Sequence, residues 1–102
     1  SLINFDAFDL VVAGDDVARP KPFPDPYLRA AELLEIDITE AVVIEDSGTG
    51  VAAGRASGAV TLGVPHIVSL DGSDAHELWP TLAGRTSADI CDLAGRHAKE
   101  NA

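Results

Sequence analysis

Short apolar runs alternate with polar segments along the chain, and the residue types of these runs predict strands. Residues 10–13 and 59–64 are rich in β-branched residues and are bounded by glycine or proline, which is typical of buried strands. A third run, 41–44, breaks abruptly into two carboxylates, a hydroxyl and two glycines. We therefore expect three strands, the middle one ending in a polar tip.

Helical periodicity separates these runs. Apolar residues in 27–34 recur at the spacing i, i+3, i+4 and i+7, which predicts a helix over 25–35 with Asp25 as its N-cap. Small apolar residues predict a second helix over 51–58, closed by a left-handed Gly58.

The last third of the sequence has a weaker pattern. It predicts a short helix at 74–78, with Trp79 covering the core, and a terminal helix at 88–98. Strands that alternate with helices predict an α/β fold, a Rossmann-like parallel sheet in a three-layer α/β/α arrangement. We expect residues 1–102 to form one domain, with the motifs in 9–66 and a terminal helical segment in 67–102.

Charge and composition narrow the function. Seven basic residues against seventeen acidic ones give a net charge of −10 over 102 residues, which argues against binding nucleic acid or an anionic membrane. The sequence contains no apolar run of the roughly 20 residues needed to span a bilayer. A single cysteine, Cys91, fits a reducing compartment, so a cytoplasmic protein is expected.

Two places carry residues suited to chemistry. Glu45 and Asp46 follow a predicted strand, where two carboxylates suit the oxygen-preferring ion Mg²⁺. Lys21 lies between Pro20 and Pro22, which stiffen its loop. A lysine facing a carboxylate-bound cation can hold a phosphate. The alternative is that both are ordinary solvated loops, because most charged residues are exposed.

The chain also resembles the haloacid dehalogenase superfamily. Residues 16–28, Asp-Val-Ala-Arg-Pro-Lys-Pro-Phe-Pro-Asp-Pro-Tyr-Leu, resemble its lysine motif. Residues 43–53, Val-Ile-Glu-Asp-Ser-Gly-Thr-Gly-Val-Ala-Ala, resemble its acidic metal motif. Within the superfamily, the segments that follow resemble the β-phosphoglucomutase-like and phosphoglycolate phosphatase-like branch.

This resemblance implies a magnesium-dependent phosphatase or phosphomutase that acts on a small phosphorylated metabolite through an aspartyl phosphate. It implies that Lys21 stabilises the nucleophile and the transferring phosphoryl group, that Asp46 binds Mg²⁺, and that Glu45 supports the metal directly or through water. Ser47 would help to orient the site. Pro20 departs from the family, which usually has glycine before the lysine.

The family's nucleophile, in an Asp-x-Asp-x-Thr/Val segment upstream of the lysine motif, has no match in this chain. The resemblance therefore implies the carboxyl-terminal half of the family's core, without the first strands and the cap, and we expect it to be inactive alone. The nucleophile strand would lie between strand 41–44 and strand 10–13. Without it we expect a gap, or pairing with another copy through open sheet edges.

Two other interpretations remain open. A non-catalytic truncated α/β domain could bind a partner through its sheet edges. A receiver-type phosphoacceptor domain also combines acidic residues, a lysine and a parallel sheet, but it needs the lysine late in the chain. The three histidines, His66, His76 and His97, are widely spaced and are expected to have surface or packing roles.

Overall fold

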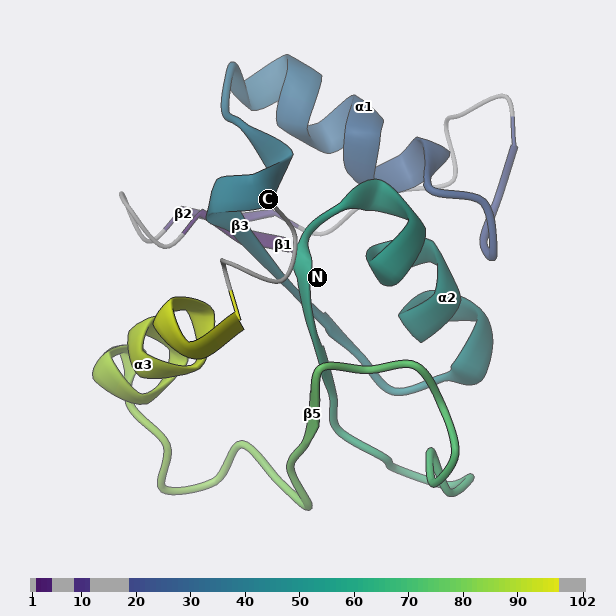
Figure 1. The fold of residues 1–102 in the computed structure, drawn as a ribbon, viewed down its shortest axis with the longest axis vertical. Helices are drawn as coiled ribbons and strands as arrows, with labels where there is room; N and C mark the ends of the chain where they lie inside the picture. The colour runs from purple at the N-terminus through teal and green to yellow at the C-terminus, as the bar shows by residue number, and fades with distance from the viewer. Residues whose placement is uncertain (1, 5–8, 12–18, 98–102) are drawn as a thin grey trace.

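The computed structural model describes residues 2–4, 9–11 and 19–97. Figure 1 shows a sheet with helices on both of its faces. In chain order the elements are β1 (Leu2–Asn4), β2 (Asp9–Val11), α1 (Asp25–Leu34), the 3₁₀ turn η1 (Ile38–Glu40), β3 (Ala41–Glu45), α2 (Gly48–Ser57), β4 (Val60–Gly63), β5 (Glu77–Leu78) and α3 (Ser87–His97).

The sheet has the strand order β2-β1-β3-β4-β5. Strands β3, β4 and β5 are parallel, which confirms the α/β fold with parallel neighbours at 41–44 and 59–64. Strand β1 is antiparallel to both β3 and β2. The space expected between β2 and β3 is therefore filled by β1 of the same chain, and the sheet is mixed rather than wholly parallel.

Two apolar clusters lie on opposite faces of the sheet because side chains alternate along a strand. Val43 packs with Tyr27 of α1 and Ala53 of α2. Its neighbour Val42 packs on the other face with Trp79, which follows β5, and with Leu93 of α3. The three layers are thus α1 and α2, the sheet, and α3 (Figure 1).

Two helices begin one to three residues earlier than expected. Asp25 was expected to be the N-cap of α1 but is its first residue, and Pro24 takes the cap position. The Asp25 carboxylate instead pairs with Arg19 at 3.1 Å. Helix α2 begins at Gly48, three residues before the expected start, because the Ser47 hydroxyl accepts a hydrogen bond from Gly50 N. Gly58 closes α2 in the left-handed region, as predicted (φ 94°).

The prediction of a short helix at 74–78 is wrong. His76 N donates to the Thr61 carbonyl at 2.8 Å and Trp79 N to the Gly63 carbonyl at 2.9 Å, and these bonds hold β5 as a strand beside β4. Trp79 is buried, as expected, and α3 matches the predicted terminal helix up to residue 97. Among the described helices none combines the length and the apolar character that crossing a bilayer requires.

Candidate active site

The loops that carry the candidate residues lie on one side of the molecule. The segment before α1, the turn between β3 and α2, and the loop after β4 all reach this side (Figure 1). The carboxyl ends of β3 and β4 are adjacent because the two strands are parallel and in register up to Glu45 and Gly63. Ligands of α/β folds bind at this end of the sheet.

Lys21 and Glu45 form an ion pair across 24 positions of sequence. Lys21 Nζ donates to Glu45 Oε2 at 2.6 Å. The Glu45 side chain is 5% exposed and that of Lys21 is 33% exposed. Glu45 stands two residues after Val43 and so faces α1 and α2, the side from which the Lys21 loop approaches.

Tyr27 is a site residue that the sequence analysis assigned only to the apolar face of α1. Its side chain is fully buried, and its hydroxyl donates a hydrogen bond to Glu45 Oε2. Lys21 Nζ also lies 5.4 Å from the centre of the Tyr27 ring, within the range of a cation–π contact. The available signal was that a buried tyrosine hydroxyl needs a polar partner, which Glu45 could supply.

Gly50 makes room for the Glu45 carboxylate. A Cβ atom on Gly50 would lie 1.9 Å from Glu45 Oε1, so only glycine allows the first turn of α2 to cover this group. The buried carboxylate is thus enclosed by an ammonium group, a phenol and a glycine backbone. This arrangement fixes Glu45 and, through it, the position of the Lys21 side chain.

Asp46 follows Glu45 directly, in the bend after β3, and differs from it in exposure. Its residue is exposed, and within the described part of the chain its carboxylate has no hydrogen-bond or ion-pair partner. Ser47 caps α2 and lies 3.3 Å from the Thr49 hydroxyl. The structure therefore brings Lys21 to Glu45 and leaves Asp46 open to solvent beside them.

Glu45 and Asp46 are the carboxylates available to the magnesium ion that the resemblance implies. The described residues contain no group of three histidine, cysteine or acidic side chains placed to hold a metal ion. Magnesium often uses only one or two carboxylates and keeps several waters. Asp46 fits as such a ligand, whereas Glu45 is buried and already accepts hydrogen bonds from Lys21 and Tyr27 through Oε2.

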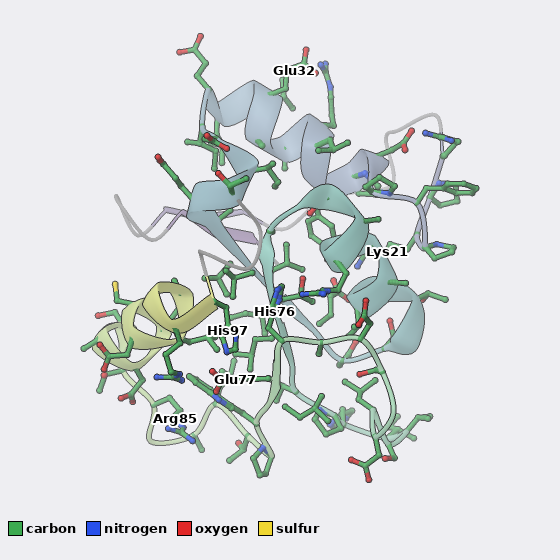
Figure 2. The ribbon with its side chains drawn as sticks, in the orientation of Figure 1. Lys21, Glu32, His76, Glu77, Arg85 and His97 are labelled. Atoms are coloured by element: carbon green, nitrogen blue, oxygen red, sulfur yellow. The ribbon has the colours of Figure 1, made fainter. Side chains whose placement is uncertain are left out.

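A second charged cluster lies away from Lys21, between β5 and α3 (Figure 2). Glu77 accepts hydrogen bonds from Arg96 at 2.9 and 3.0 Å and from Trp79 Nε1 at 3.1 Å, and it lies 2.7 Å from His97. Chiefly through the Arg96 bonds, the pKa of Glu77 is lowered to about 2. This cluster joins α3 to the sheet, and His76 and His97 have packing contacts there, with ring centres 5.2 Å apart.

The part of the chain that carries both motifs is similar to known proteins. The family model described as haloacid dehalogenase-like hydrolase matches residues 2–64, which include both motifs. The bifunctional riboflavin kinase/FMN phosphatase of Arabidopsis thaliana is 42% identical over 62 residues, which are 61% of this chain and 16% of that protein. A phosphoglycolate phosphatase of Cupriavidus necator is 44% identical over 50 residues, 49% of this chain and 22% of that protein.

A solved structure agrees in fold. A haloacid dehalogenase hydrolase of family IA, variant 3, from Entamoeba histolytica superimposes with a TM-score of 0.70 at 21% sequence identity. The match covers 89% of this chain and 44% of that structure. The chain therefore spans less than half of this structure and under a quarter of the two curated relatives above.

Proposed function

This chain belongs to the haloacid dehalogenase-like hydrolases, and we propose that it supplies the lysine and acidic part of a magnesium-dependent phosphatase or phosphomutase site. The substrate is a small phosphorylated metabolite, and the reaction passes through an aspartyl phosphate. The observation that carries this proposal is the Lys21–Glu45 pair at 2.6 Å with the open Asp46 carboxylate next to it. The phosphatase names of the two relatives support the same reaction class.

Each residue has a distinct role in this proposal. Glu45 and Tyr27 hold Lys21 at the carboxyl end of the sheet, where its ammonium group neutralises charge on the phosphoryl oxygens. Asp46 is the carboxylate ligand of Mg²⁺, and Glu45 acts on the metal through water. A bound Mg²⁺ would supply further positive charge toward the phosphoryl oxygens. Ser47 keeps the first turn of α2 in place beneath Asp46.

The attacking carboxylate is not among these residues. Phosphoryl transfer through an aspartyl phosphate needs a nucleophilic oxygen, which charge stabilisation cannot replace. We propose that this aspartate comes from an Asp-x-Asp segment outside residues 1–102, and that these residues are inactive without it. A reducing, cytoplasmic setting is part of the same proposal, since Cys91 is the sole cysteine in the sequence.

The test is a fusion enzyme. Residues 1–102 are joined behind the nucleophile strand and cap of a phosphatase of the same family, and magnesium-dependent hydrolysis of small phosphate esters is measured. Lys21→Ala and Asp46→Ala should each lower kcat by roughly a hundredfold or more, as expected when electrostatic stabilisation is lost. Arg29→Ala, an exposed cation on α1, is the control and should change kcat little. Equal activity in all four proteins would reject these roles.

A further inference from the structure

The loop of residues 19–25, which carries Lys21 and leads into α1 (Figure 1), has few backbone groups that can hold it in place. Its three prolines have no backbone N–H and so cannot donate a hydrogen bond. Phe23 N donates to the Pro20 carbonyl at 3.1 Å, which closes a turn that contains Lys21. This bond holds the tip of the loop but does not fix the tip relative to α1.

Side chains connect the loop to the helix. Arg19 Nε donates to Asp25 Oδ2 at 3.2 Å, and Arg19 Nη2 lies 3.1 Å from Asp25 Oδ1, so the two groups form a bidentate ion pair. The Arg19 guanidinium also lies over the Phe23 ring, 4.6 Å from its centre. Asp25 is the first residue of α1. Arg19, Phe23 and Asp25, the loop clamp, therefore close the loop around Lys21 and fasten it to α1.

The loop clamp matters more for position than for stability. The side chain of Arg19 is 59% exposed and that of Asp25 is 20% exposed, and exposed ion pairs usually add little stability. Lys21 has a long, flexible side chain, and its 2.6 Å contact with Glu45 depends on where the loop backbone lies. Helix α1 also carries Tyr27, which bonds to the same Glu45 oxygen. The clamp thus ties Lys21 to the helix that already holds Glu45.

We propose that Arg19 is a positioning residue for Lys21. Through Asp25 and Phe23 it holds the loop so that the Lys21 ammonium group stays on Glu45 at the carboxyl end of the sheet. Arg19 acts through the loop and not on the phosphoryl group, because Asp25 and Phe23 engage its guanidinium. The effect on catalysis rests on the proposed function, whereas the effect on the Lys21–Glu45 contact is independent of it.

A double-mutant cycle on the 102-residue chain measures the effect on this contact. Urea unfolding followed by Trp79 fluorescence gives the factor by which Lys21→Met raises the unfolding equilibrium constant. In an Arg19→Gln background this factor should be smaller by at least about threefold, because the contact is already weakened. Charge alone predicts the opposite sign, since removing Arg19 relieves repulsion and makes the Lys21 charge more favourable.

Three further variants separate position from charge. Arg19→Lys keeps the positive charge but cannot form the bidentate pair, so it should also reduce the factor for Lys21→Met. Asp25→Asn removes the other half of the pair and should do the same. Arg29→Gln is the matched control, because Arg29 pairs with Glu32 at 3.3 Å on α1, outside the loop. It should leave the factor unchanged.

The fusion enzyme measures the effect on catalysis. Arg19→Gln should lower kcat about tenfold and change KM by less than about twofold, because a displaced Lys21 loses contact with charge that develops during phosphoryl transfer. Arg19→Lys should not restore kcat, and Arg29→Gln should leave both constants unchanged. A purely structural role for Arg19 would lower the fraction of folded enzyme and leave kcat per folded molecule as it is.

The outcomes distinguish this inference from the proposed function. If Arg19→Gln leaves the factor for Lys21→Met unchanged or raises it, or if Arg19→Lys keeps the wild-type value, Arg19 does not position Lys21 and the inference is overturned. The same holds if the fusion depends on Lys21 but Arg19→Gln leaves kcat unchanged. If the factor falls as expected while Lys21→Ala has no effect on kcat, the proposed function fails and the structural link from Arg19 to Lys21 is supported.

Discussion

Gly50→Ala is expected to destabilise the protein because of a single collision with Glu45. The added Cβ would lie 1.9 Å from Glu45 Oε1 and 2.4 Å from its Cδ. The carboxylate cannot move aside freely, because Lys21 and Tyr27 both bond to its other oxygen. The substitution should therefore break the arrangement that orients Lys21.

The magnitude follows from opposing effects. Alanine in a helix is usually about 1 kcal/mol more favourable than glycine. Breaking a buried ion pair costs about 3–5 kcal/mol, and the lower end applies here because Lys21 is 33% exposed. Loss of the Tyr27 hydrogen bond adds about 1 kcal/mol. Together these predict that the free energy of unfolding falls by about 3 kcal/mol.

Urea unfolding followed by fluorescence measures this change, because Trp79 is the sole tryptophan and is 5% exposed. Gly48→Ala is the matched control at the start of the same helix, where an added Cβ has no atom within 4 Å. It should be neutral or stabilising by up to about 1 kcal/mol. In a Glu45→Ala background, Gly50→Ala should no longer destabilise. An unchanged cost in that background, or no cost in the wild type, would refute the collision.

Three further predictions follow. Tyr27→Phe should lower the free energy of unfolding by about 1–2 kcal/mol, because Glu45 loses a buried donor; an unchanged urea midpoint would contradict this contact. The folded-state pKa of Glu77, about 2 against an ordinary 4.5, means that its stabilisation is present above about pH 4.5 and is lost as the pH falls toward 2. Urea unfolding should therefore show Glu77→Gln to be less stable at neutral pH but close to the wild type near pH 2, and a constant difference would contradict this. Calorimetry on residues 1–102 should give a Kd for Mg²⁺ of about a millimolar that Asp46→Asn weakens further, because so few protein oxygens are available; a micromolar Kd would mean that the ligand set is larger.

Much of the fold follows from local sequence signals. The apolar runs predict β3 and β4, the helical period predicts α1 and more weakly α3, and Gly58 ends α2 where a left-handed residue is required. Two edge features do not follow. Residues 2–4 have no period that would predict an antiparallel strand, and β5 is a two-residue strand that exists through backbone bonds to β4.

The site was predictable in part. The order of the strands predicts that Lys21 and the acidic pair meet at one end of the sheet. The sequence offered both Glu45 and Asp46 to a metal ion, whereas the structure buries Glu45 against Lys21 and leaves Asp46 exposed. The role of Tyr27 depends on how α1 packs over β3, and the closure of the loop 19–25 depends on side-chain contacts. Neither is encoded in a local pattern.

The central claim is that these residues supply the charge-stabilising part of a phosphatase site and not its nucleophile. The most direct measurement compares initial rates of p-nitrophenyl phosphate hydrolysis, with and without Mg²⁺, for residues 1–102 alone and for the fusion that carries the Asp-x-Asp strand. The isolated chain should be no faster than buffer, and the fusion should be active only with Mg²⁺. Magnesium-dependent hydrolysis by residues 1–102 alone, abolished by Lys21→Ala in the same preparation, would contradict the claim.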